Sequence, residues 1–130
     1  MATLQCISEI NGLPLPRGPF SQGVMAGGEF VFVAGQGPYH PATAKFVRGS
    51  IGEQTRLTLE CLDRVLLAAG TSRERVVSCR VYLQPLDPET FAMMNAVYAE
   101  FFGAHKPART TIGAQLLGID VEIDCVAQRP

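Results

Sequence analysis

Hydrophobic and polar residues form short, strand-like patterns in several parts of this chain, and the first runs from Gly23 to Gly35. An extended stretch leads into Gly27-Gly28, and Phe30-Val31-Phe32-Val33-Ala34 then follows with apolar residues at both parities. A glycine pair between two such runs is typical of a β-hairpin, and a strand that is apolar on both sides needs cover on both faces. We therefore predict a hairpin here, followed by a loop over residues 36–49.

Two later segments have the spacing of amphipathic helices. Ser50-Ile51-Gly52-Glu53 has the form of a capping box, and Gly70 is a helix stop. The apolar positions between them recur every three or four residues: Leu59, Leu62, Leu66 and Ala69. Asp87-Pro88 is a second helix start and Gly103 a second stop. The apolar stripe of this second helix consists of Phe91, Met94, Tyr98 and Phe101.

Alternation predicts further strands over residues 76–83, 109–115 and 119–127, and a short one near Leu4 to Ile7. We expect the last two long strands to be neighbours around the Leu117-Gly118 turn. In the strand at 76–83, one side should carry Val77, Cys79, Val81 and Leu83, and the other Arg80 and Tyr82. The order of elements predicts one α+β domain over residues 1–130, with both helices on one face of the sheet.

Residue parity on the last two strands indicates a candidate site. The helix-covered face suits Ile119, Val121, Ile123 and Cys125, which leaves Asp120, Glu122 and Asp124 on the opposite face. If Ile112 also points inward, Arg109 lies outward beside Glu122. A guanidinium beside a carboxylate could bind a small acid and hydrolyse it. Three acids on one strand point at successive depths and rarely converge on one ion, so we predict no metal site.

The face without helices would expose the apolar side chains of Phe30-Val31-Phe32-Val33. We expect other copies of the chain to cover them in a closed ring, which would set Arg109 in clefts between protomers.

Composition limits the partners of the protein. The 130 residues are 47% hydrophobic and 18% charged, and a formal charge of -1 disfavours both nucleic acid and a polybasic membrane anchor. The four cysteines, Cys6, Cys61, Cys79 and Cys125, form no C-x-x-C pair, so we expect reduced thiols and no zinc. The first sixteen residues contain no Lys or Arg, and no apolar stretch is long enough for a membrane span, so we expect a cytoplasmic protein.

Five segments together resemble the RidA/YjgF family of enamine/imine deaminases. They are Gly18-Pro19-Phe20-Ser21-Gln22-Gly23, Val33-Ala34-Gly35-Gln36, Asn95-Ala96-Val97-Tyr98-Ala99-Glu100-Phe101-Phe102, Pro107-Ala108-Arg109-Thr110 and Val121-Glu122-Ile123. The resemblance implies a chorismate-mutase-like fold, a homotrimer with its sheet faces inward and sites between subunits, and hydrolysis of 2-enamino and 2-imino acids, such as 2-aminoacrylate or 2-aminocrotonate, to 2-keto acids and ammonia. It implies no cofactor.

Site residues follow from the same resemblance, position by position. Arg109 stands at the place of the family's carboxylate-binding arginine, and Glu122 where a glutamate orients or activates water. Asn95 matches an asparagine near that site. Three positions depart from the pattern: Phe20 replaces a common tyrosine, Ala34 a common serine, and Thr111 a residue that is often cysteine.

The departures leave alternatives open. Loss of the two hydroxyls at Phe20 and Ala34 could change substrate preference, because pockets that form hydrogen bonds discriminate strongly. It is also consistent with a non-catalytic member of the family that binds a small carboxylate or another protein. An RNA-degrading role, described for some relatives, fits the near-neutral composition poorly.

Overall fold

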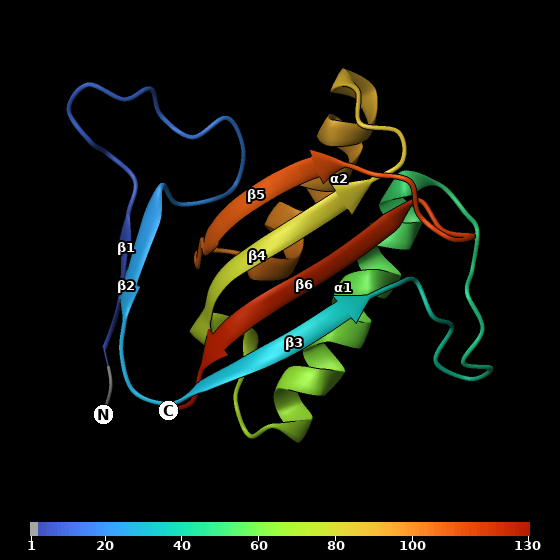
Figure 1. Cartoon of the computed structure of the whole chain (residues 1–130), viewed down its shortest axis with the longest axis horizontal. Helices are drawn as coiled ribbons and strands as arrows, with labels where there is room; N and C mark the ends of the chain where they lie inside the picture. The colour runs from blue at the N-terminus through green and yellow to red at the C-terminus, as the bar shows by residue number, and fades with distance from the viewer. Residues whose placement is uncertain (1–2) are drawn as a thin grey trace.

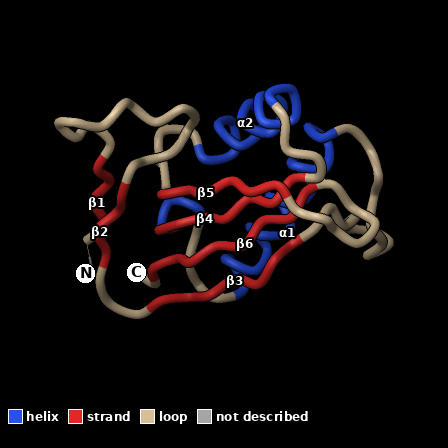
Figure 2. Tube along the Cα trace, turned by 45° about the horizontal axis from the view of Figure 1, so that its top comes forward, coloured by secondary structure: helices blue, strands red, loops and turns tan. Residues whose placement is uncertain are grey.

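The computed structural model describes residues 3–130, in which a four-stranded sheet carries two helices on one face (Figure 1). The strands are β3 (Phe30–Gln36), β4 (Val76–Leu83), β5 (Ala108–Gly113) and β6 (Val121–Gln128), in the order β3-β6-β4-β5. Figure 2 shows the same order from the edge at β5 to the edge at β3. β4 and β5 are parallel and the other neighbours antiparallel, so the predicted α+β class with a mixed sheet is confirmed.

Helix α1 (Ile51–Ala68) begins and ends where its sequence signals predict. The Ser50 hydroxyl accepts a hydrogen bond from the backbone N–H of Glu53 at 3.1 Å, which satisfies one of the free donors of the first turn. Gly70 follows the helix with φ +78°, the left-handed conformation that glycine adopts without a steric penalty.

Helix α2 (Pro88–Phe102) carries a reciprocal cap. Asp87 accepts from the Thr90 N–H at 2.9 Å, while the Asp87 N–H donates to the Thr90 hydroxyl at 3.1 Å. The helix ends at Gly103, as predicted, and connects β4 to its parallel neighbour β5.

The core lies between the helices and one face of the sheet. The strands contribute Val33, Val76, Cys79, Val81, Leu83, Val121, Ile123, Cys125 and Ala127, and the helices contribute Leu59, Leu62, Leu66, Met94, Tyr98 and Phe102. One strand prediction is wrong, because a register shift between Val76 and Ser78 puts Val76, rather than Val77, on the core side. The alternation from Cys79 onward is as predicted.

The predicted hairpin around Gly27-Gly28 does not form. β2 (Gly23–Ala26) pairs instead with β1 (Leu4–Ile7) in a separate two-stranded ribbon, and β3 pairs with β6. Figure 1 shows this ribbon beside the main sheet. The glycines turn the chain, but a turn signal does not say which distant strand will supply the hydrogen bonds.

β5 and β6 are not neighbours either, because β4 lies between them. They also differ in length from the predicted ranges 109–115 and 119–127. The Leu117-Gly118 turn therefore joins two strands that do not pair, and each of them forms its ladder with β4.

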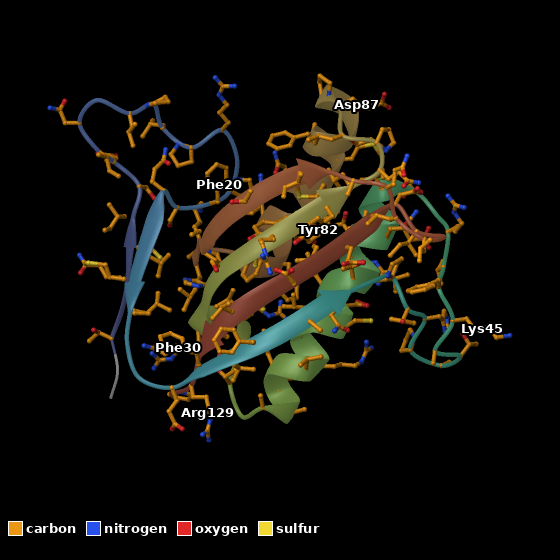
Figure 3. All side chains as sticks on the ribbon, viewed as in Figure 1. Phe20, Phe30, Lys45, Tyr82, Asp87 and Arg129 are labelled. Atoms are coloured by element: carbon orange, nitrogen blue, oxygen red, sulfur yellow. The ribbon has the colours of Figure 1, made fainter. Side chains whose placement is uncertain are left out.

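The sheet face without helices carries several exposed apolar side chains. Phe32 is 78% exposed, and Phe30 and Ile112 are 38% and 42% exposed. Figure 3 labels Phe30 at the start of β3 and Tyr82 on β4. Among residues 3–130, no helix combines the length and the apolar character needed to cross a membrane.

Candidate functional site

Arg109 lies on β5 with its side chain under helix α2, not on the helix-free face. Its Cα partner in the neighbouring strand is Cys79, which pairs in turn with Cys125, and both cysteines point into the core. Residues paired across a sheet point to the same side, so Arg109 shares their side. The residue is only 9% exposed. The prediction that Arg109 points outward is therefore wrong.

The prediction failed because β5 is an edge strand with a weak apolar pattern. The alternation pattern predicts that Ile112 points inward, but it pairs with Tyr82 on the helix-free face and is exposed there. The inward positions belong to Arg109 and Thr111, whose long or branched side chains can line a core while keeping a polar end.

The guanidinium of Arg109 is surrounded by uncharged groups. Its central carbon lies 4.8 Å from the ring centre of Tyr98, 5.0 Å from that of Phe20 and 5.5 Å from that of Phe91. Nη1 lies 3.7 Å from the sulfur of Met94. Burial lowers the pKa of Arg109 from its usual value. Within the described chain, the ion pairs we find involve other arginines.

One edge of this guanidinium has no protein partner. Nε and Nη2 are both buried and make no hydrogen bond among the described residues, whereas Nη1 faces Met94. Nε–H and one Nη2–H point in the same direction, and this parallel pair is the fork that grips both oxygens of a carboxylate. The bidentate edge of the arginine is thus buried and unpaired within the described chain.

Other unsatisfied polar atoms gather around it. Of six buried side-chain oxygens and nitrogens without a partner in residues 3–130, five belong to Arg109, Asn95, Tyr98 and Thr111, and the sixth is the Thr58 hydroxyl on α1. Buried polar groups in proteins are nearly always paired, so such a concentration in one place indicates a site for a polar ligand. We call these four residues the arginine cluster.

The segment Gly18–Ser21 covers the arginine cluster. Ser21 is bound to the chain just before β5, since its N–H donates to the Pro107 carbonyl at 3.0 Å and its hydroxyl donates to the Lys106 carbonyl. A Cβ placed on Gly18 would lie 2.9 Å from Arg109 Nη2 and 3.2 Å from the Asn95 amide. Glycine therefore allows this segment to approach the cluster closely. Figure 3 shows Phe20 in this segment, beside β5.

Glu122 lies on the opposite, helix-free face of the sheet. Its Cα partner is Tyr82, and the next acidic residue of β6, Asp124, is paired with Arg80 at 2.9 Å. A Cβ on Gly35 of β3 would lie 2.9 Å from the carboxylate carbon of Glu122. The predicted face-sharing of Arg109 and Glu122 within one chain is thus wrong.

The residues predicted for the site therefore separate into two groups. Arg109, Thr111, Asn95 and Phe20 meet under α2, whereas Glu122 lies across the sheet. Ala34, next to Gly35 on the exposed part of β3, is on the Glu122 side.

Sequence reasoning missed Tyr98, Phe91 and Gly18 as members of the site. Tyr98 and Phe91 were assigned to the apolar stripe of the helix, and both do face the core. The signal for a second role was their spacing from Asn95, since residues 91, 95 and 98 lie on one side of a helix.

A hollow between the helices is a weaker candidate for a functional site, and no metal site is found among the described residues. A hollow of about 500 Å³ between α1 and α2 is bordered by arginines that already have partners, with Arg56 on Glu60 and Arg73 on Asp63, each at 3.0 Å. Nowhere in the described part of the chain do three or more His, Cys, Asp or Glu side chains gather as metal ligands would.

Fold and site together define an α+β protein with a buried, unpaired arginine at one edge of its sheet. The family model described as "Endoribonuclease L-PSP" matches residues 11–129, so this chain belongs to that family, which is also known as the RidA/YjgF family.

Individual relatives support the same family assignment. A RutC family protein of Pyrococcus horikoshii is 46% identical over 118 residues, which cover 89% of this chain and 91% of that protein. YyfB of Yersinia pestis, a Rid-family protein of unknown function, is 28% identical with a TM-score of 0.85 over 96% of this chain and 98% of its own. E. coli TdcF, solved with bound serine, is 31% identical with a TM-score of 0.71 over 97% and 100% of the two chains.

Proposed function

We propose that this protein hydrolyses small 2-imino and 2-enamino acids to 2-keto acids and ammonia, with Arg109 as the carboxylate-binding residue. The observation that carries the proposal is the buried guanidinium whose Nε and Nη2 edge has no protein partner. A single fixed cation among neutral groups suits a monoanion, and its planar fork suits a carboxylate. The bound serine of TdcF, itself a small carboxylate, supports this choice of ligand class.

The neighbouring groups can bind the rest of such a substrate. Asn95 and Thr111 each bring an unpaired side-chain oxygen to the arginine cluster, and Phe20 stacks against the guanidinium. Asn95 can accept a hydrogen bond from the imine or enamine nitrogen, and the Thr111 hydroxyl can donate to the carboxylate. The imine carbon is then held at a fixed distance from the carboxylate, which reduces the entropy lost in reaching the transition state.

Hydrolysis itself needs one water and two proton transfers. Water adds to the electrophilic carbon of the imine while the nitrogen gains a proton, which gives a carbinolamine. A second proton then moves from the carbinolamine hydroxyl to the amine, and ammonia leaves to give the keto acid. A carboxylate that takes a proton from the attacking water and returns it to the nitrogen can accelerate these steps. We assign this role to Glu122.

Glu122 can reach the substrate only from another protomer, because it lies on the other face of its own sheet. We therefore propose a homotrimer in which the helix-free face of one protomer meets the edge at β5 of the next. This arrangement covers Phe32 and brings Glu122, Gly35 and Ala34 of one chain to the arginine cluster of its neighbour.

The activity is tested by generating 2-aminoacrylate or 2-aminocrotonate with a dehydratase and measuring the release of keto acid. We expect the protein to accelerate release and Arg109→Ala to abolish the acceleration. Equal rates with and without the protein would refute the proposal for these substrates.

Subunit mixing tests the shared site. Arg109→Ala and Glu122→Gln chains, each inactive alone, should regain activity when unfolded and refolded together, because some interfaces then combine an intact arginine with an intact glutamate. Activity that never returns on mixing, from variants that do assemble with each other, would place both groups in one chain.

A second candidate is a non-catalytic protein that binds a small carboxylate through the same cluster. The separation of Glu122 from Arg109 within the chain favours it, since binding requires only the cluster. Arg109-dependent binding of pyruvate without acceleration of imine hydrolysis would select this candidate.

A further inference from the structure

Helix α2 holds the guanidinium of Arg109 without any charged group. Phe91, Met94 and Tyr98 lie along one side of the helix, three, four and seven residues apart, and all three contact Arg109. Phe20 adds a third aromatic ring from the covering segment.

Arginines that have a carboxylate partner are held differently. Arg80 bonds to Asp124 at 2.9 Å, and Arg73 bonds to Asp63 at 3.0 Å although it also lies over the Phe101 ring, 3.9 Å from the ring centre. A carboxylate in that position also fixes an arginine, but it uses the N–H groups that a substrate would need. An aromatic ring attracts the cation through its face and forms no hydrogen bond with the N–H edge. Aromatic rings can thus orient an arginine and leave its N–H edge available to bind a carboxylate.

Tyr98 is the most deeply buried of the three rings around the guanidinium. It is completely buried, and its centre is the closest of the three to the guanidinium carbon. Its hydroxyl points toward the thiol of Cys79 in the core and has no nitrogen or oxygen partner within residues 3–130. Burial raises the pKa of this phenol well above its usual value, so the side chain stays neutral and does not pair with the arginine as an anion.

We propose that Tyr98 is a positioning residue whose ring holds Arg109 with the Nε and Nη2 edge turned toward the substrate carboxylate. The role rests on the carboxylate site proposed above. In this role the ring of Tyr98 orients Arg109 and the hydroxyl contributes nothing. A role as proton donor would instead require the hydroxyl.

Three variants test this role, with the affinity for pyruvate, measured by calorimetry or NMR titration, as the main readout. A buried cation–π contact contributes enough that Tyr98→Leu should weaken pyruvate binding roughly 10- to 30-fold. Tyr98→Phe, which keeps the ring, should bind within about twofold of the wild type. Phe102→Leu is the matched control, because Phe102 is also buried on α2 and contacts the Tyr98 ring, but has no cation–π contact with Arg109. It should bind normally.

Two further readouts separate positioning from a general loss of structure. In the imine hydrolysis assay, Tyr98→Leu should raise KM far more than it lowers kcat. The Nε–H resonance of Arg109 should keep its ring-current shift in Tyr98→Phe and lose it in Tyr98→Leu. If Tyr98→Leu does not fold, Tyr98→Met takes its place with the same expectations.

The results distinguish the inference from the function on which it rests. Pyruvate binding that is equally weakened in Tyr98→Leu and Phe102→Leu, or equally weakened in Tyr98→Phe and Tyr98→Leu, would overturn the positioning role while Arg109→Ala still abolishes binding. If instead Arg109→Ala binds pyruvate like the wild type, the carboxylate site is wrong, and the role of Tyr98 falls with it.

Discussion

At the scale of single residues, two arginines of this chain differ in burial and in their partners. Arg80, on the exposed face, forms an ion pair with Asp124, as a surface arginine usually does. Arg109 is buried among three rings and a thioether, with two N–H groups unpaired. A buried cation without a counter-ion is costly unless a ligand supplies one. This difference makes Arg109 the residue on which the proposed function rests.

Gly35 should be required for activity, although not for stability. An alanine Cβ there would approach the carboxylate carbon of Glu122 to 2.9 Å, and a flexible carboxylate can move away at little cost to folding. If Glu122 activates water, displacing it by about 1 Å should lower imine hydrolysis roughly tenfold or more. Pyruvate affinity should not change.

Gly23→Ala is the control for this prediction, since nothing lies within 4 Å of a Cβ at that position. Full activity in Gly35→Ala would argue against the assigned role of Glu122.

Stability should depend on Tyr98 at alkaline pH. Burial raises the pKa of this phenol in the folded protein, whereas in the unfolded chain it ionises near pH 10. Above about pH 10 the unfolded chain has lost a proton that the folded protein keeps, so the free energy of unfolding falls as pH rises, by up to about 1.4 kcal/mol per pH unit.

Tyr98→Phe removes this dependence while Cys79, Cys125 and Arg109, which face the phenol, remain. Urea unfolding from pH 8 to 11 should show the variant gaining stability relative to the wild type above about pH 10. Parallel curves for the two proteins over the whole range would contradict the burial effect.

At the scale of elements, local signals decide where the helices begin and end. Both helices start at the predicted caps and stop at the predicted glycines, because capping groups and left-handed glycines act on neighbouring backbone only. Accurate placement of α2 matters for the proposed site, since its register brings Asn95 and Tyr98 to Arg109.

Removing the N-terminal cap of α2 should destabilise the protein. Asp87→Ala loses the hydrogen bond to the Thr90 N–H and should lower the free energy of unfolding by about 1 kcal/mol. Asp87→Asn keeps an oxygen acceptor and should remain close to the wild type. Chemical denaturation measures both, and equal stability of Asp87→Ala and the wild type would show that this cap contributes little.

At the scale of the whole molecule, the sheet has one covered and one open face. Helices α1 and α2 cover the side of the sheet that contains the core (Figure 1). On the other side, Phe32 is 78% exposed. A large exposed ring among further apolar side chains typically marks an interface. The proposed trimer would both bury this face and complete the site.

A charge on the open face should therefore prevent assembly. We expect Phe32→Glu to reduce the sedimenting species from trimer to monomer and to abolish imine hydrolysis. Leu67→Glu places the same charge on the exposed side of α1, where Leu67 is 62% exposed, and should leave the trimer intact. A wild-type protein that sediments as a monomer at micromolar concentration would refute the proposed assembly itself.

The sequence by itself determined the class of fold, the bounds of both helices, the core positions on β6 and the family. These follow from periodicity, from caps and from short motifs, all of which are local properties of the chain. It also indicated that Arg109, Asn95 and Phe20 belong together, through the family resemblance.

Only the tertiary structure decided which strands pair and which face each residue takes. The partner of β3 is β6, nearly a hundred residues later in the chain, and β4 separates β5 from β6. Because β5 is an edge strand with a single large apolar residue, its orientation follows from its register with Cys79 on β4 and not from its own pattern. That register turned Arg109 inward, away from Glu122, and made Tyr98 its neighbour.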